Sequence, residues 1–300
     1  MLRSFIYVIV VSSLILSCNL NYTKENFKSN VTPKNISKSG VVNKKSIKLL
    51  SWNIRDLGKS KDDQEILQIA KIINPFDLIA IQEVVAKDPA GAQAVAKIVA
   101  ELNRMGSAWD YSISDPTNSP SVFMSERYAF IWKKSKLKLL EKPFLDEKLK
   151  DTIYREPYIG KFKLKKDLNN FYVINYHSRK YNDNPEEEII FFDKYPKRFK
   201  SNNILIAGDF NLNEKHNVWN SLYELGFKSA IKESPTTLKT KCKNGIYLNH
   251  SIDNIYFDNK NISNMNSGRI DFVMHCDNLE QARFLSDHLP VFLEFNIENN

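Results

Sequence analysis

From Ser46 onward the chain alternates short apolar runs with amphipathic stretches. Apolar runs of strand length predict β-strands over residues 47–54, 78–81, 128–132, 158–164, 171–176, 204–207, 252–257, 269–274 and 290–297. Helical spacing of apolar residues predicts helices over 66–73 and 95–102, and further helices are expected near 186–200 and 215–225. Many strands with few helices in one continuous run predict an α/β (α+β) four-layer sandwich, in which two packed mixed β-sheets are flanked by helices.

The first 18 residues have the pattern of an export signal. Arg3 supplies a positive charge, and the apolar run over 5–16 is too short to span a bilayer comfortably. The run ends in Leu16-Ser17-Cys18, which resembles the lipobox of bacterial lipoproteins, where the cysteine is lipidated and becomes the new N-terminus. We therefore expect an exported lipoprotein anchored to a bacterial membrane through Cys18, on the periplasmic or cell-surface face. The alternatives are a plain signal peptide, which gives a secreted protein, and an uncleaved anchor.

Residues 19–45 differ from both flanking segments. They are rich in Asn, Lys, Ser and Thr and have no apolar periodicity, so they cannot bury enough surface to order themselves. We interpret them as a flexible tether with a reach of about 30 Å. The remaining residues, 46–300, form the expected catalytic domain, for which we predict a monomer.

The overall composition is that of a globular protein, with 42% hydrophobic and 26% charged residues, which excludes fibrous and multi-span membrane classes. The formal net charge is +8. A basic chain favours a polyanionic partner such as nucleic acid or an anionic membrane surface. A solvated, lysine-rich surface from a biased genome would give the same number, so charge alone does not choose between them.

Polar residues that can support chemistry cluster at the ends of the predicted strands. The first two strands end near Asn53 and Glu83, the strand over 204–207 is followed by Asp209 and Asn211, and two further sites are Asp253 and the pair Asp287-His288. Each alone could be a turn or cap residue. Because so many fall at the predicted mouth of one set of sheets, we expect an active site there.

These residue types indicate a divalent metal and acid–base chemistry. Carboxylate and amide oxygens suit Mg²⁺, whereas the chain has no HxxxH or CxxC spacing that would indicate zinc. His288, beside Asp287, can act as a general base toward water, and His177, at a predicted strand end, can protonate a leaving oxygen.

A series of short motifs carries a family resemblance. In chain order they are Trp52-Asn53-Ile54-Arg55, Ile81-Gln82-Glu83, Glu126-Arg127-Tyr128, Arg155-Glu156-Pro157, His177-Ser178, Gly208-Asp209-Phe210-Asn211, Asp253-Asn254-Ile255 and Ser286-Asp287-His288. From about residue 48 to 295 the chain resembles the endonuclease/exonuclease/phosphatase superfamily, and within it the deoxyribonuclease I-like branch. The motifs at Glu126 and Arg155 indicate the nuclease branch more narrowly than the others do.

The resemblance implies an activity and assigns catalytic roles. It implies a metal-dependent endonuclease that hydrolyses DNA phosphodiester bonds and leaves 5′-phosphate ends. His288, oriented by Asp253, would take a proton from the attacking water. His177, oriented by Glu126, would protonate the leaving 3′ oxygen.

The resemblance also implies metal and phosphate ligands. Glu83 and Asn53, with Asp287, would hold Mg²⁺, with Mn²⁺ or Ca²⁺ as alternatives. Asp209 and Asn211 would position the metal, the water or the scissile phosphate. Arg55 and Arg155 would contact phosphates.

Two departures from the family pattern concern substrate binding. Val85 stands where the family has an arginine that enters the minor groove, and Met124 stands where it typically has a tyrosine. A lipid or small-molecule phosphodiesterase of the sphingomyelinase type is therefore the alternative, and a phosphate- or nucleic-acid-binding relic without activity is a third reading. Cys242 and Cys276 either pair as a disulfide or are two unrelated thiols, because the sequence does not give their distance.

Overall fold

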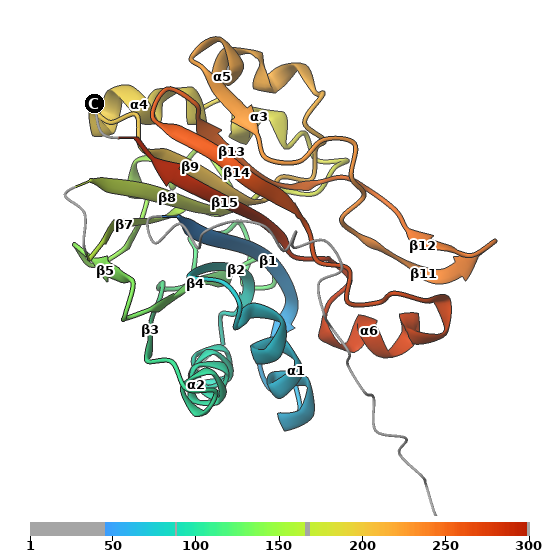
Figure 1. Ribbon diagram of the computed structural model, residues 1–300. Coiled ribbons are helices and arrows are strands. Elements are labelled where there is room, and N and C mark those ends of the chain that lie inside the picture. The colour runs from blue at the N-terminus through green and yellow to red at the C-terminus, as the bar shows by residue number, and fades with distance from the viewer. Residues whose placement is uncertain (1–45, 88, 166–168, 299–300) are drawn as a thin grey trace, which may run out of the picture. The chain divides into compact units, whose positions relative to one another are not determined.

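The computed structural model describes residues 46–87, 89–165 and 169–298. The predicted lipidation site Cys18 and the predicted tether over 19–45 lie outside the described residues. The described chain contains two large β-sheets packed face to face, with helices on both outer sides (Figure 1). The predicted four-layer sandwich is confirmed.

The first sheet has six strands in the order β14-β15-β1-β2-β4-β3. Their bounds are Ile47–Leu57 (β1), Leu78–Val85 (β2), Trp109–Ile113 (β3), Glu126–Lys133 (β4), Ile262–Arg269 (β14) and Val291–Ile297 (β15). The second sheet has seven strands along the path β10-β13-β9-β8-β7-β5, with β6 beside β7. Their bounds are Leu137–Leu139 (β5), Phe144–Leu145 (β6), Tyr158–Leu164 (β7), Asn170–His177 (β8), Ile204–Asp209 (β9), Phe227–Ser229 (β10) and Asp253–Asp258 (β13). Parallel pairs β1–β2 and β8–β9 make both sheets mixed.

Strand β1 shows how the sequence builds the layers. Ile47 and Leu49 point into the core between the two sheets, whereas Leu50, Trp52 and Ile54 point into the core beneath the outer helices. Successive side chains of a strand alternate between faces, so a strand that is apolar at nearly every position is buried on both sides. Burial of both faces fixes the register of β1 and with it the position of Asn53, the last residue of β1 before its pairing with β2 shifts.

The helices form the two outer layers. α1 (Asp63–Ile73) and α2 (Ala90–Arg104) pack their apolar stripes on the first sheet, and a capping box formed by Asp62 and Glu65 begins α1. The second sheet is covered by α3 (Glu186–Ile189), α4 (Tyr195–Phe199) and α5 (Asn220–Glu224), with the short 3₁₀ turns η2 (Phe192–Lys194) and η3 (Asn217–Trp219). A further 3₁₀ turn, η1, spans Glu147–Leu149.

One predicted element is corrected. The strand predicted over 269–274 is wrong, because β14 occupies Ile262–Arg269 instead. β14 is an edge strand with polar side chains, so it lacks the apolar run of a buried strand, and the Asp271 carboxylate accepts the N–H groups of Val273 and Met274 in a turn just beyond it. The helical stretches expected over 186–200 are present as three short segments, α3, η2 and α4, and Pro196, which has no N–H to donate, lies in the first turn of α4.

A separate two-stranded hairpin and a helix stand beside the first sheet. The hairpin consists of β11 (Leu238–Lys243) and β12 (Ile246–Leu248), and it leads away from the sheets toward α6 (Leu279–Leu285) (Figure 1). Cys242 of β11 forms a disulfide with Cys276 of the 3₁₀ turn η4 (Cys276–Asn278), with their Cα atoms 5.6 Å apart. The disulfide therefore fixes the hairpin to the start of α6. Within the described residues, no helix is both long and apolar enough to cross a membrane.

Candidate active site

Three of the predicted site residues form one row across the second sheet. In the register of its strands, His177 of β8 lies beside Asp209 of β9, and Asp209 lies beside Asp253 of β13. Gly208 permits this close packing, because a Cβ atom at that position would lie 1.7 Å from the carbonyl oxygen of Tyr176. The close approach of β8 and β9 therefore requires a glycine at this position of the Gly-Asp-Phe-Asn motif.

The first sheet contributes a second group through an irregularity in its pairing. The register between β2 and β4 shifts between Ile81 and Val84, and Glu83 within this bulge has a φ of +58°. Such a backbone is strained for a non-glycine residue and is typical of functional sites. The bulge brings the Glu83 carboxylate to Asn53 of β1, whose Nδ2 donates to Glu83 Oε1 at 3.0 Å.

His177 is held by a buried carboxylate. Its Nδ1 lies 2.9 Å from Glu126 Oε2, and the same carboxylate accepts the backbone N–H of Glu83 at 3.2 Å. Arg155 also pairs with Glu126, with its Nε 3.2 Å from Oε2, and its Nη1 donates to the carbonyl of Ser178. Arg155 is buried and two of its three nitrogens bind protein acceptors, so only Nη2 is left for the phosphate contact that the sequence predicts.

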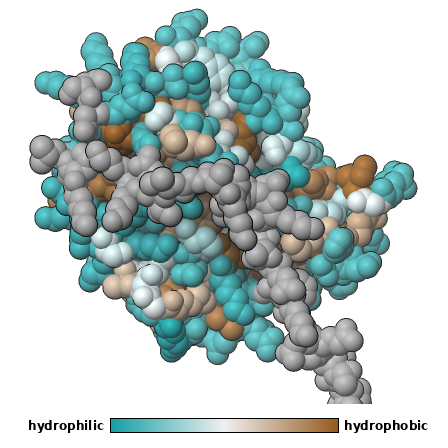
Figure 2. Space-filling model, viewed as in Figure 1, coloured by the Kyte–Doolittle hydropathy of each residue, from teal (hydrophilic) through white to brown (hydrophobic). Residues whose placement is uncertain are grey.

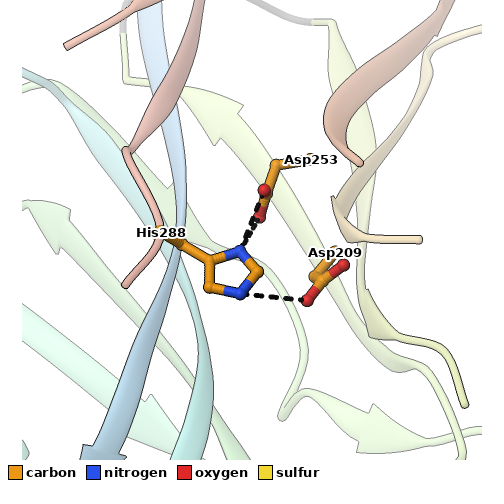
Figure 3. A group of neighbouring side chains, drawn as sticks. All are labelled: Asp209, Asp253 and His288. Carbon is orange, nitrogen blue, oxygen red and sulfur yellow. Dashed lines mark hydrogen bonds and ion pairs between the residues drawn. The ribbon is translucent and has the colours of Figure 1, made fainter. Parts of the chain in front are cut away.

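His288, like His177, is held at Nδ1 by a buried carboxylate. Its Nδ1 lies 3.0 Å from Asp253 Oδ2, and Thr236 Oγ1 donates to that same oxygen at 2.6 Å. Figure 3 shows the His288 ring between two carboxylates, with Asp253 at one nitrogen and Asp209 at the other. Each predicted histidine–carboxylate pair is therefore present in the fold, and each leaves its Nε2 directed inward.

The two histidines converge on one oxygen. Asp209 Oδ2 lies 3.5 Å from His177 Nε2 and 3.7 Å from His288 Nε2. Burial alone would lower the pKa of both imidazoles. The neighbouring carboxylates outweigh burial: Glu126 raises the pKa of His177, and Asp253 and Asp209 raise the pKa of His288 to about 10.

The residues present fit a divalent cation. Asn53 Nδ2 joins Glu83 and Asp209 by donating to both carboxylates, and this fixes the amide so that its Oδ1 is buried without a hydrogen-bond partner. This buried amide oxygen, which accepts no hydrogen bond, lies beside two carboxylates. Together these oxygens form a ligand set suited to a hard cation. Asp209, Asp253 and His288 also each offer a ligand atom, and these atoms lie within 4.8 Å of one another.

Two other predicted residues lie at the rim of this site. The Arg55 guanidinium is about half exposed and its Nη1 lies 3.5 Å from Asp287 Oδ2. Arg283 lies 3.6 Å from the same oxygen, so Asp287, the third predicted metal ligand, is shared by two guanidinium groups. Asn211 has a φ of +51° and donates its backbone N–H to Asp209 Oδ1, which turns the chain directly after the metal-site carboxylate.

Supporting residues that the sequence does not reveal hold these groups in place. Trp52 Nε1 donates to the carbonyl of His288, and Ser286 Oγ donates to the carbonyl of Asn53 while accepting the N–H of His288. Together they fasten the loop before β15 to β1. Thr236 lies 17 residues before Asp253 in an irregular segment with no periodic pattern, so no spacing in the sequence points to it.

A comparison with protein families decides the identity of the fold. The model of the Endonuclease/Exonuclease/phosphatase family matches residues 50–292. The chain belongs to this family. It is therefore a hydrolase that acts on phosphodiester bonds, of the nuclease or phosphatase type, and the predicted resemblance to the deoxyribonuclease I-like branch is confirmed.

The chain is similar in sequence to a known protein and in structure to others, among them the following two. A protein named deoxyribonuclease from Thioalkalivibrio sp. (strain K90mix) is 27% identical over 271 residues, covering 83% of this chain and 71% of that protein. A Bacteroides vulgatus family member matches with a TM-score of 0.62 and 16% identity, covering 84% of this chain and 99% of that one. TDP2 from D. rerio, solved with a single-strand DNA product, matches with a TM-score of 0.56 and 16% identity, over the same 84% and 99%. The two structures establish the fold alone.

Proposed function

We propose that this hydrolase is a metal-dependent endonuclease that cuts DNA and leaves 5′-phosphate ends. The observation that carries the proposal is the pair of imidazoles, each bound to a buried carboxylate, with both Nε2 atoms within 3.7 Å of one Asp209 oxygen. Hydrolysis of a phosphodiester needs a base toward water and an acid toward the leaving oxygen, and two oriented imidazoles can supply both.

The histidines divide this work by their position. His288 accepts the proton of the attacking water at Nε2, because its Nδ1 is held by Asp253. A divalent cation beside Asp209 would offset the negative charge that raises the pKa of His288, and would so favour the neutral ring that a base requires. His177 donates a proton from Nε2 to the leaving 3′ oxygen, because Glu126 holds its Nδ1 and favours the charged ring. Cleavage of the bond to the 3′ oxygen leaves the phosphate on the 5′ side.

Glu83, Asn53 and Asp209 are the proposed ligands of the divalent cation. Asp287, which the family resemblance also implies as a ligand, lies at the rim of the site. A bound Mg²⁺, or Mn²⁺ or Ca²⁺ in its place, supplies positive charge that neutralises the phosphate oxygens. Asn53 positions the two carboxylates for that ion, because its amide bridges them.

Three observations support DNA as the substrate. The sequence relative is named a deoxyribonuclease, and the chain has a net charge of +8. Arg55 is about half exposed at the rim and can meet a phosphate. Arg155 is proposed mainly to hold Glu126 and the backbone after His177.

A lipid phosphodiesterase of the sphingomyelinase type is the second candidate, and one observation favours it. Val122 and Phe123 are 83% and 96% exposed in the loop that leads into Glu126. Apolar side chains that project beside an active site can enter a lipid surface.

Incubation of the purified chain with supercoiled plasmid separates these functions. We expect nicking with Mg²⁺ and none after EDTA, and nicks that DNA ligase reseals without a kinase because they carry 5′-phosphates. His288→Ala should remove activity, whereas the exposed His275→Ala should not. Hydrolysis of sphingomyelin by a chain that leaves plasmid intact would replace the proposal with the lipid alternative.

We also propose that the protein is an exported monomer anchored to the membrane through a lipid on Cys18. Labelling with a radioactive fatty acid tests this directly. The label should appear on the wild-type chain and be absent from Cys18→Ser. Equal labelling of both chains, or none of either, would refute the anchor, and sedimentation of the Cys18→Ser chain tests the monomer.

A further inference from the structure

The hairpin formed by β11 and β12 grows directly out of the candidate active site. Thr237 pairs with His288, and the N–H of Leu238, the first residue of β11, donates to the carbonyl of Asp287 at 2.8 Å. Lys243 ends β11 five residues later, which corresponds to about 17 Å of extended strand. The hairpin therefore reaches from the catalytic histidine out over the flanking surface.

Three lysines lie at alternate positions along this hairpin. Leu238 and Cys242 pack against the core beneath the outer helices, whereas Lys241 and Lys243 are exposed and Lys239 is half-buried. The pairing of β11 with β12 shifts register between Leu238 and Lys243, so the lysines do not lie on one strictly alternating face. Residues two apart on an extended strand are about 7 Å apart, which is about the rise of two nucleotides along the axis of a duplex. The lysines are therefore close enough together to contact neighbouring phosphates of one backbone.

The charge of these lysines is not neutralised by the protein. Across residues 46–87, 89–165 and 169–298, none of the three ammonium groups forms an ion pair, whereas Lys133, Lys136, Lys161 and Lys215 each bind a carboxylate. Residues 234–252 contain no Asp or Glu. The Asp271 carboxylate, which lies beside the hairpin, accepts a hydrogen bond from Tyr247 at 2.6 Å.

The tip of the hairpin argues against insertion into a membrane. β11 and β12 are joined by Asn244-Gly245, both with positive φ, in a tight two-residue turn. A polar turn is a poor wedge for lipid, although Ile246 beside it is exposed. At the right-hand edge of Figure 2, where the hairpin projects, hydrophilic residues lie beside apolar ones.

We propose that the β11–β12 hairpin is a nucleic-acid-binding arm, which holds the phosphate backbone of duplex DNA on one side of the scissile bond. This inference rests on the proposed endonuclease function. The disulfide between Cys242 and Cys276 holds the arm at a fixed angle to the active site, so phosphates on the arm and the bond to be cut have a fixed relation.

Binding of a fluorescent 30-base-pair duplex in EDTA tests the arm without any cleavage. The full chain is compared with Lys239→Gln/Lys241→Gln/Lys243→Gln and with a control of equal charge, Lys138→Gln/Lys142→Gln/Lys228→Gln, whose lysines are exposed on other elements. Three lost phosphate contacts should reduce the slope of log K against log salt by about 2.7. The control should keep the wild-type slope.

Three results would refute the proposed role of the arm. The first is an unchanged salt slope in the arm variant, and the second is an equal change in the control variant. The third is an arm variant that no longer binds phosphatidylglycerol vesicles but still binds DNA, which would make the hairpin a membrane contact.

A chromogenic thymidine phosphodiester separates binding by the arm from the chemical step, because the arm variant should hydrolyse it at the wild-type rate. A wild-type chain that binds duplex through the arm but cuts no DNA would refute the endonuclease function alone.

Discussion

Replacement of Thr236 by valine removes one hydroxyl from behind the proposed catalytic base. In the wild-type structure this hydroxyl donates to Asp253 Oδ2 at 2.6 Å and accepts the N–H of Asp253 at 3.1 Å. Thr236 is completely buried, so water cannot take the place of the lost donor. Valine keeps the volume and shape of threonine, and the change is therefore confined to the hydrogen bonds.

The size of the effect follows from the type of bond. A buried hydrogen bond to a charged group contributes about 1.5–3 kcal/mol. Because Asp253 orients His288, we expect an effect of this size on the transition state, which corresponds to a rate about 10- to 100-fold lower at 1.36 kcal/mol per tenfold. The same lost bond should separately lower the free energy of unfolding by about 1–2 kcal/mol.

Single-turnover plasmid nicking at saturating enzyme measures the rate, and urea unfolding measures the stability of the same preparations. Thr236→Ser is the matched control, because it keeps the hydroxyl and loses only a methyl group, so it should nick DNA within about threefold of wild type. A valine variant that is folded and nicks DNA at the wild-type rate would show that Asp253 needs no such support. A serine variant as slow as the valine variant would show that packing, and not the hydrogen bond, matters.

Three further changes test separate parts of the molecule. Asn53→Ala removes the amide between Glu83 and Asp209, and the Mg²⁺ concentration for half-maximal nicking should rise about 10- to 100-fold; an unchanged midpoint would refute Asn53 as part of the metal site. Burial of Tyr158 raises the pKa of its hydroxyl to about 12, so its contribution to stability is complete below pH 10 and lost as the pH rises through 12. Between pH 10 and 12, Tyr158→Phe should therefore lose less stability than wild type, by at most about 3 kcal/mol in urea unfolding. Identical slopes of the unfolding free energy against pH in the two proteins would contradict this. Cys242→Ser/Cys276→Ser should lower the unfolding free energy by about 2–4 kcal/mol, and unchanged stability under oxidising conditions would show that the pair is not formed in solution.

The buried strands and their ends could be predicted from the sequence because local chemistry determines them. Asn53 lies where the regular pairing of β1 with β2 ends, and His177 and Asp209 end the buried strands β8 and β9. The parallel neighbours β8 and β9 place their ends in register at one edge of their sheet. The sequence therefore predicts which residues meet. It does not predict how they meet, since the bulge that turns Glu83 inward depends on pairing between β2 and β4.

The missed features depend on contacts between distant segments. Thr236 has no local pattern, and β14 is a polar edge strand whose only strand partner among the described residues is β15. The β11–β12 hairpin is different, because Asn244-Gly245 is a recognised two-residue turn signal. The sequence still does not predict its two strands, because the flanking residues, rich in lysine, lack the apolar alternation of a buried strand.

The most direct test of the account asks whether the two histidines divide acid and base work. An oligonucleotide with sulfur in place of the 3′ oxygen has a leaving group that departs without protonation. On the ordinary substrate, His177→Ala and His288→Ala should both nick at least about 100-fold more slowly than wild type. On the sulfur substrate we predict that His177→Ala recovers most of its rate while His288→Ala does not. Equal recovery of both variants, or of neither, would contradict the assignment.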